Sequence, residues 1–402
     1  MLTTSLRDRR GEALPVRARQ VQRPKVLHLI TWLQPGGIER WLLEMLRQIP
    51  QAECAMDVCC KGPDLGVLAG AARDRGAVTY LCPLTVNPMS FANQLSRILK
   101  EGGYNILHNH LGAHSGLPVW IARRAGVRVM TSYHNTRFAP QTLTRLPVLR
   151  HVRALYGRLS VGYAVGNSDV VTGCSQGVLT SIAGAEATND RCRVLYYGIP
   201  TEPAPASRAR HAIRIGLGFA PETPLVLHVG RFLAQKNHLG LLEIWKRVLT
   251  RTPTARLLLV GDGPLRPTVE RALGRLKLGG TVRFLGVRAD VNEIMGGCDV
   301  FLFPSLHEGL PMSAIEANGA GLPVVGTDVA GINEVVANGE TGLLHPVEDV
   351  DGMASSVSRL LEEKERARNL SPSGTKTVRE RFSAAVSARR LLGLYHECLG
   401  LG

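Results

Sequence analysis

The sequence lacks the features of membrane-spanning, disulfide-rich and repeat proteins. It contains no apolar stretch near the roughly 18 residues that a transmembrane helix needs. Its eight cysteines form no C-x-x-C pair and several fall in predicted strands, which favours small core residues in a reducing compartment over disulfides or a zinc site. No repeat with a period of about 20 to 50 residues is present, which excludes a solenoid.

Acidic residues are missing from one long internal stretch. No Asp or Glu lies between Glu101 and Asp169, so that part of the net charge of +15 gathers on one lobe. Anionic lipid headgroups or a lipid-linked diphosphate would suit this face, since a clustered Arg contributes about 1 kcal/mol near an anionic membrane. A merely solvated basic surface is the alternative. Nucleic acid is not an expected partner, because aromatic interleaving and binding motifs are absent. The basic residues of the stretch are Arg123, Arg124, Arg128, Arg137, Arg145, Arg150, Arg153 and Arg158.

The length of 402 residues suits two domains of ordinary size. Residues 1–24 are polar and basic, have no hydrophobic periodicity and predict a flexible tail. This tail lacks the apolar core of a secretory signal, and its acidic residues Asp8 and Glu12 argue against a transit peptide. We therefore expect a cytoplasmic protein, either soluble or peripheral on the inner face of the cytoplasmic membrane.

Short apolar runs alternate with helical patterns in both halves of the chain, which predicts two doubly wound parallel sheets. The first domain is expected over 25–200 and the second over 225–380. Between them, the composition of 201–224 breaks the alternation and indicates an interdomain linker. The expected strands are 26–31, 56–61, 78–82, 106–110, 127–133, 170–174 and 194–197, then 225–229, 256–260, 282–285, 300–303, 322–325 and 342–345.

The segment 308–316 places two carboxylates around the start of a short helix. An apolar run predicts a buried strand just before it, with Pro311 at the first helical position and Gly319 just past the helix end. Backbone N–H groups around Gly309, Leu310 and Pro311 would then be free to face a diphosphate. Glu308 lies before the helix and Glu316 on it, so one carboxylate can reach a sugar and the other a ribose.

The run "HEGLPMSAIEANGAGLPVVGT" resembles the signature of the retaining glycosyltransferases of family 4. This resemblance extends from about Lys25 to the C-terminus. It implies the GT-B fold, with two Rossmann-like domains facing a central cleft and a C-terminal helix, here 381–402, packing back on the first domain. It also implies that Glu308 contacts the hydroxyls of the donor sugar and Glu316 the ribose.

Other positions match the same family. Arg231 and Lys236 resemble its Arg/Lys pair for the donor diphosphate, and their chemistry suits phosphate oxygens. Gly36 and Gly37 resemble its glycine loop, and "GGIERW" resembles capsular and exopolysaccharide members. His134 resembles the T-x-H position beside the reacting sugar. The predicted catalytic residues are His134 and Glu308, and the predicted donor-binding residues are Gly36, Gly37, Arg231, Lys236, Gly309, Leu310, Pro311 and Glu316.

No metal or cofactor is expected. His108, His110 and His114 form a tempting cluster, but no Cys or carboxylate lies nearby in sequence, and His110 is better assigned to the acceptor side. The D-x-D of Asp349 and Asp351 begins a predicted helix, where acids stabilise the N-terminus. The turn Gly261-Asp262-Gly263-Pro264 lacks the Lys-Ser/Thr of a P-loop, so we assign it a structural role.

These assignments predict a retaining glycosyltransferase that moves a sugar from a UDP- or GDP-sugar to a glycan or lipid-linked acceptor in envelope polysaccharide synthesis. Two alternatives stay open: a catalytically weak GT-B scaffold acting as a membrane-associated partner subunit, and a nucleotide-sugar epimerase that needs no acceptor. A hydrolase is disfavoured, because eight helical residues span about 12 Å. Glycosidase carboxyl groups lie only ~5 to ~9.5 Å apart.

Overall fold

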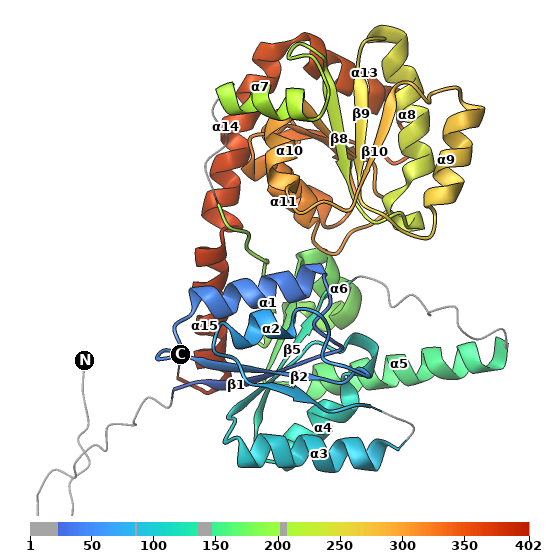
Figure 1. Cartoon of the computed structure of the whole chain (residues 1–402). Helices are drawn as coiled ribbons and strands as arrows, with labels where there is room; N and C mark the ends of the chain where they lie inside the picture. The colour runs from blue at the N-terminus through green and yellow to red at the C-terminus, as the bar shows by residue number, and fades with distance from the viewer. Residues whose placement is uncertain (1–22, 85–86, 136–146, 202–206, 402) are drawn as a thin grey trace, which may run out of the picture.

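The computed structural model describes residues 23–84, 87–135, 147–201 and 207–401. Most of the predicted tail, together with Arg137 and Arg145, lies outside these residues. Two lobes are stacked one above the other, and each is built on its own parallel sheet (Figure 1). The prediction of two doubly wound parallel-sheet lobes is confirmed.

The lower lobe in Figure 1 is built on a seven-stranded sheet in the order β3-β2-β1-β4-β5-β6-β7. The switch between β1 and β4 leaves a crevice beyond their carboxyl ends, which is where open α/β sheets bind ligands. The strands are β1 Lys25–Ile30, β2 Ala55–Cys60, β3 Thr79–Leu81, β4 Ile106–Asn109, β5 Arg128–Tyr133, β6 Val170–Gly173 and β7 Cys192–Val194. The helices of this part are α1 Gly37–Gln48, α2 Ala69–Arg73, α3 Pro88–Glu101, α4 Gly116–Arg124, α5 Pro147–Asn167 and α6 Gln176–Ala183, with the 3-10 turns η1 Gly112–His114 and η2 Gly184–Thr188.

The upper lobe is built on a six-stranded sheet in the order β10-β9-β8-β11-β12-β13. Its switch point lies between β8 and β11, the strands that precede the two donor-site loops predicted above. The strands are β8 Leu225–Val229, β9 Arg256–Val260, β10 Val282–Gly286, β11 Val300–Phe303, β12 Val324–Thr327 and β13 Gly342–His345. The helices are α7 Ser207–Gly216, α8 His238–Arg251, α9 Arg266–Arg275, α10 Val291–Gly297, α11 Met312–Gly319, α12 Ile332–Val335, α13 Val350–Glu362 and α14 Lys364–Arg381, with the 3-10 turn η3 Ala234–Lys236.

Local chemistry explains why these elements begin where they do. The central strands are buried along nearly their whole length, as parallel strands covered on both faces must be. Asn87 caps α3 by accepting hydrogen bonds from two backbone N–H groups, and Pro88 follows at the first helical position. Ser175 and Ser383 cap α6 and α15 (Ala384–Cys398), and each accepts a hydrogen bond from one backbone N–H group.

Two sequence-based boundaries differ from the structure. The stretch 201–224 contains helix α7, and Arg214 on that helix donates to the Gly297 carbonyl and binds Asp299, both in the upper lobe. Its Pro- and Ala-rich flanks hid this short helix. Helix α11 begins at Met312, one residue after Pro311, and Gly319 is its last residue instead of its stop signal. Capping geometry, which the pattern does not encode, sets these ends.

The C-terminal helix α15 returns to the lower lobe after α14 has run down the side of the upper lobe (Figure 1). On α15, Ser387 Oγ accepts a hydrogen bond from Trp41 Nε1 of α1 at 2.9 Å. Glu397 near its end forms an ion pair with Arg193 at 2.7 Å. The last helix of the chain therefore contributes directly to the lobe that the first residues build.

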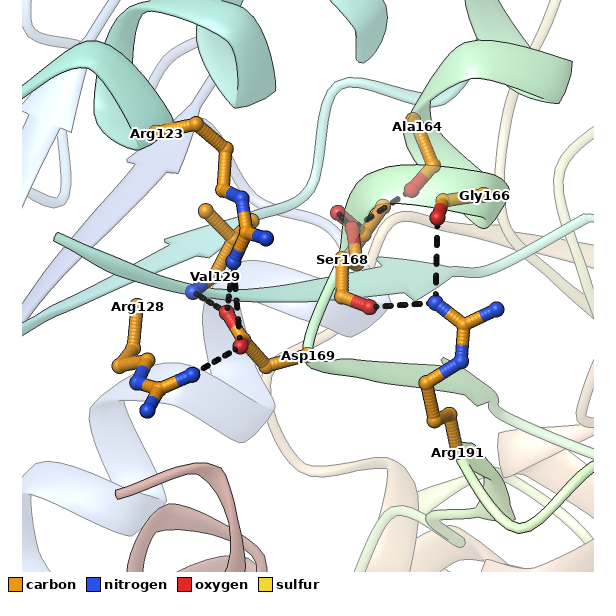
Figure 2. A network of polar contacts seen from close by, with 9 residues as sticks. Arg123, Arg128, Val129, Ala164, Gly166, Ser168, Asp169 and Arg191 are labelled. Carbon is orange, nitrogen blue, oxygen red and sulfur yellow. Dashed lines mark hydrogen bonds and ion pairs between the residues drawn. The ribbon is translucent and has the colours of Figure 1, made fainter. Parts of the chain in front are cut away.

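Part of the predicted basic face is neutralised within the fold. Asp169, which ends the acid-free stretch, binds both Arg128 at 2.7 Å and Arg123 at 3.2 Å (Figure 2). It also accepts the backbone N–H of Val129 at 2.8 Å. Arg123 on α4 and Arg128 on β5 thus both bind the residue before β6, so they have a structural role.

None of the helices in the described ranges combines the length and the apolarity that a bilayer span requires. Seven of the eight cysteines are buried as free thiols, consistent with small core residues. The junctions that follow the strands bring polar side chains to the carboxyl ends of the two sheets.

Candidate active site

Two loops of the upper lobe meet at the tips of the neighbouring strands β8 and β11. Lys236 Nζ in the first loop lies 2.7 Å from Glu308 Oε1 in the second. Gln235 Nε2 donates to the other oxygen of the same carboxylate at 3.1 Å and to the His307 carbonyl at 2.8 Å. The ammonium also lies 4.7 Å from the centre of the Phe303 ring. Two residues that sequence separates by 72 positions therefore form one buried charge pair.

Arg231 occupies the same loop as Lys236 but is exposed. Its loop rests on the Gly261–Gly263 turn: a Cβ on Gly261 would lie 2.2 Å from the Gly230 carbonyl oxygen, and a Cβ on Gly263 would lie 2.8 Å from the backbone nitrogen and oxygen of Phe232. Both glycines have positive φ angles, 127° and 159°. This turn therefore has a structural role, because it packs against the loop that carries Arg231. The Arg231 side chain itself is exposed.

The residues after Glu308 lead into the N-terminus of α11. Leu310 and Pro311 are buried and fix the path of the chain. In the described part of the molecule, the backbone N–H groups of Gly309, Leu310 and Ser313 make no hydrogen bond to another protein group. Unpaired N–H groups at such a position are suited to an anion.

The two lobes touch at Gly309. A Cβ on Gly309 would lie 2.2 Å from the backbone oxygen of His134, which follows β5 of the lower lobe. Behind Gly309, Gly331 has a φ of 87° and packs on the carbonyls of Glu308 and Gly309. Only glycine permits this close approach of backbone to backbone.

A second contact between the lobes lies beside the first. Glu334 on α12 accepts hydrogen bonds from the backbone N–H groups of Gln176 and Gly177 at 2.7 and 2.8 Å. It therefore caps the N-terminus of α6 from the opposite lobe. The Tyr196 hydroxyl also donates to Glu334 at 3.1 Å. A carboxylate at a helix N-terminus is a favourable electrostatic arrangement.

The glycine loop of the lower lobe faces the start of α11 in the upper lobe. A Cβ on Gly37 would lie 3.8 Å from Met312 Cγ, so the N-termini of α1 and α11 oppose each other. The side chain of Glu39 folds back against Gly36. Burial raises the pKa of Glu316 to about 7, and the positive charge of Arg40 opposes this shift. Arg40 was not predicted as a site residue, although its position one turn after the glycines could have indicated it.

His134 lies at the cleft with both ring nitrogens engaged by the protein. Its Nδ1 contacts the Tyr197 hydroxyl, and its Nε2 lies 3.1 Å from Nδ1 of His110. Tyr197 in turn stacks on Trp41, with the ring centres 4.7 Å apart. Burial lowers the pKa of His134 to about 3, so the ring is neutral. Tyr197 and Trp41 were not predicted as site residues.

His110 belongs to a buried cluster and not to the exposed acceptor side. His28 from β1 joins His108 and His110, and one ring nitrogen of each lies within 4.8 Å of the other two. His114 lies apart, against Tyr156. Sequence analysis missed His28 because it sits within an apolar run. Its pairing with His108 in register on adjacent strands brings it into the cluster.

Both carboxylates of the D-x-D segment have structural roles. Asp349 caps α13 by accepting the Gly352 N–H at 2.8 Å, which lowers the pKa of Asp349, and it also contacts His345 at 3.0 Å. Asp351 pairs with Arg247 at 2.7 Å. Their placement at a helix N-terminus agrees with the sequence-based assignment.

Two parallel-sheet lobes with a polar site at the strand tips between them define the GT-B class of glycosyltransferases. The profile described as "Glycosyltransferase Family 4" matches residues 35–203, and that described as "Glycosyl transferases group 1" matches 223–363. The chain therefore belongs to the family 4 glycosyltransferases.

Relatives of known name agree with this assignment. The putative glycosyltransferase EpsF of Bacillus subtilis is 28% identical over 76% of this chain and 79% of its own length. The UDP-Gal:alpha-D-GlcNAc-diphosphoundecaprenol alpha-1,3-galactosyltransferase of Escherichia coli is 27% identical over 85% of this chain and 88% of its own. Both matches span the two lobes.

Solved structures share the fold. HepE of Anabaena, solved in complex with UDP, superposes with a TM-score of 0.78 at 18% identity, covering 91% of this chain and 98% of that one. Sucrose-phosphate synthase of Thermosynechococcus elongatus superposes with a TM-score of 0.72 at 21% identity, covering 94% of this chain and 100% of its own. At this level of identity the likeness concerns the fold.

Proposed function

We propose that this protein transfers a sugar, with retention of its anomeric configuration, from a nucleoside diphosphate sugar to a hydroxyl of a glycan or lipid-linked acceptor. The reaction would serve envelope polysaccharide synthesis. The observation that carries the proposal is the buried Lys236–Glu308 pair beside the unpaired N–H groups at the start of α11. A cation, an anion and free amide donors close together match a diphosphate joined to a polyhydroxyl sugar.

Each group has a distinct task in this reaction. Lys236, the exposed Arg231 and the N–H groups near Gly309 would stabilise the negative charge that grows on the departing diphosphate. Glu308 would accept hydrogen bonds from the sugar hydroxyls, and Glu316 from the ribose. The departing phosphate oxygen would help to take the proton of the attacking acceptor hydroxyl on the same face. Since cationic side chains supply the charge stabilisation, the reaction is proposed to need no metal.

His134 would act on the reacting face through its backbone carbonyl and its rigid position. Both of its ring nitrogens are already in hydrogen bonds, so direct donation from the ring to the sugar would require one of them to break. Gly36 and Gly37 would let α1 approach the phosphate closely. UDP is the favoured donor nucleotide, because HepE was solved with UDP and the E. coli relative is named for UDP-Gal.

Ligand-detected NMR against UDP, GDP and their common sugar conjugates, in buffer with a chelator, tests the donor site. Selective binding that is lost in Lys236→Ala and Glu316→Ala, and kept in the exposed-surface control Lys246→Ala, supports it. Absence of binding to every nucleotide would overturn the donor assignment and favour a scaffold protein. Conversion of the bound donor to an isomer without acceptor would instead identify an epimerase.

An anionic membrane surface is the proposed location of the acceptor. Helix α5 carries a stripe of exposed apolar side chains at helical spacing, with the exposed Arg153 and Arg158 among them. Such an amphipathic face suits insertion at the level of anionic headgroups. The stripe consists of Val152, Leu155, Tyr156, Leu159 and Tyr163.

A further inference from the structure

A continuous chain of hydrogen bonds leads from the cleft into the core of the lower lobe. It begins at the Tyr197 hydroxyl, which contacts Nδ1 of His134. His134 Nε2 then lies 3.1 Å from His110 Nδ1, and His110 Nε2 lies 3.1 Å from His28 Nδ1. Three imidazoles are therefore joined nitrogen to nitrogen, each using one nitrogen toward each neighbour.

The chain continues through the C-terminal helix. His28 Nε2 lies 3.1 Å from the hydroxyl of Tyr395 on α15, and the same hydroxyl lies 2.8 Å from His108 Nδ1. His108 Nε2 lies 2.7 Å from Ser132 Oγ, which contacts Thr172 Oγ1 at 2.5 Å. The inner end is thus closed by two buried hydroxyl groups and does not reach solvent.

All four imidazoles are neutral in this environment. Burial lowers the pKa of His28 and of His134 to about 3, and it places the pKa of His108 and His110 well below the usual value. Burial likewise raises the pKa of Tyr197 and Tyr395. Each member of the chain therefore carries one mobile proton, on a ring nitrogen or on a hydroxyl oxygen.

A count of protons limits the arrangement to two states. Eight neutral groups are joined by seven contacts, and each contact needs one proton. All protons must therefore point the same way along the chain, and one proton is left over at one end. If they pointed inward, the spare donor would be Thr172 Oγ1, for which the described residues offer no recorded acceptor in the core. An unsatisfied buried donor costs about 1–3 kcal/mol. If they point outward, the spare donor is the Tyr197 hydroxyl, at the end of the chain where the contact is only part-buried, whereas the contact at the Thr172 end is buried.

We propose that His110, His28 and Tyr395 are positioning residues that fix the proton of His134 on Nδ1 and aim the Tyr197 hydroxyl proton toward the cleft. In this arrangement every contact is satisfied, and all four histidines carry their proton on Nδ1. The C-terminal helix thereby sets the hydrogen-bonding state of two cleft residues. This inference rests on the hydrogen-bond geometry of the chain and does not depend on the transfer reaction.

The same geometry weighs against a metal ion in the cluster. All six ring nitrogens of His28, His108 and His110 already have a hydrogen-bond partner within this series of contacts. Binding an ion would break several of these contacts and would bring a charge into a fully buried site, which is costly without a carboxylate or thiolate.

Nitrogen-15 NMR of the full-length protein labelled at histidine tests the proposal. Long-range correlation spectra report which ring nitrogen is protonated, and single His→Gln variants assign the signals. We expect His28, His108, His110 and His134 each to be protonated at Nδ1 alone. In Tyr395→Phe, no hydroxyl holds the proton of His28 away from Nε2, so a second tautomer should appear at His28 and reach His134.

Tyr104→Phe is the matched control, because it removes another buried tyrosine hydroxyl of the same lobe. This hydroxyl donates to Asp57 at 2.7 Å and does not belong to the hydrogen-bond chain. It should leave all four histidines unchanged. A protonated Nε2 or mixed tautomers at His134 in the unmodified protein would overturn the proposal, even if Tyr395→Phe does not fold. An unchanged His134 in folded Tyr395→Phe would do the same, as would displacement of the ring protons by added Zn²⁺.

Discussion

Lys236 Nζ lies 2.7 Å from Glu308 Oε1, with the two side chains only 16% and 6% exposed. The contact is part-buried, and the loss of one partner would leave the other without its counter-charge. The proposed ligand would thus enter a site in which the cation proposed to bind the donor and the carboxylate proposed to bind the sugar are already oriented by each other.

Lys236→Ala should therefore reduce the free energy of unfolding by about 3–5 kcal/mol, because Glu308 stays buried without its partner. Urea denaturation measures the change. Adding Glu308→Gln to Lys236→Ala should recover part of the loss, since the neutral amide no longer needs a counter-charge. The control Lys246→Ala, on the exposed face of α8, should stay within about 0.5 kcal/mol of the unmodified protein. Equal stability of Lys236→Ala and this control would contradict the prediction.

Nucleotide affinity should depend on pH through Glu316. Because the pKa of Glu316 is raised to about 7, the carboxylate that would accept the ribose hydroxyls is lost as the pH falls through that value. Calorimetric affinity for UDP should fall by up to about tenfold per pH unit below 7. Glu316→Gln should remove this step while leaving other pH effects in place, and a step that survives in Glu316→Gln must belong to another group.

The same pKa has the opposite consequence for folding stability. The folded protein holds the Glu316 proton more tightly than the unfolded chain, in which the pKa is about 4.5. At pH values between about 4.5 and about 7, the folded state therefore binds more protons than the unfolded chain. The free energy of unfolding should decline as the pH rises through this range. Thermal unfolding of Glu316→Gln beside the unmodified protein measures this slope, which should be smaller in the variant.

Gly309→Ala should prevent the two lobes from meeting. Its Cβ would lie 2.2 Å from the His134 carbonyl oxygen, so the lobes would have to separate, and displacement by about 1 Å can reduce catalysis about 100-fold. Transferase assays and small-angle X-ray scattering should show lower kcat/KM together with a larger radius of gyration. Gly274→Ala on α9, where a Cβ has open space, serves as the control. Normal activity in Gly309→Ala would show that this contact is dispensable.

Vesicle binding should depend on the apolar stripe of α5. Leu155 and Leu159 are 59% and 66% exposed, and replacing each with Gln should weaken binding to phosphatidylglycerol vesicles about tenfold. Val287 in the upper lobe is 78% exposed, so Val287→Gln controls for the loss of an exposed apolar group elsewhere. Flotation assays measure the bound fraction. Equal binding by all three variants, or binding to neutral vesicles alone, would rule out this face as an anionic-membrane contact.

Much of the fold could be predicted because buried parallel strands leave a strong local pattern. Each of the expected strands has a counterpart, and only β7 is displaced by more than a residue or two from its expected position. The short helix α7 escaped detection because its few turns are flanked by Pro and Ala, and its burial depends on Arg214 reaching residues near α10. Local composition cannot reveal a contact with residues so distant in the sequence.

The sequence by itself determined the class of sheet, the order of its elements, the strand tips that carry Lys236 and Glu308, and the helix that carries Glu316, because burial periodicity and turn chemistry act over a few residues. Tertiary structure alone decided that Lys236 pairs with Glu308, that Gly309 meets the His134 carbonyl, and that Tyr395 from the last helix joins His28 and His108. These relationships arise when strands far apart in the chain become neighbours and the C-terminal helix returns to the first lobe. No local pattern encodes them, since each depends on the distance between segments that only packing brings together.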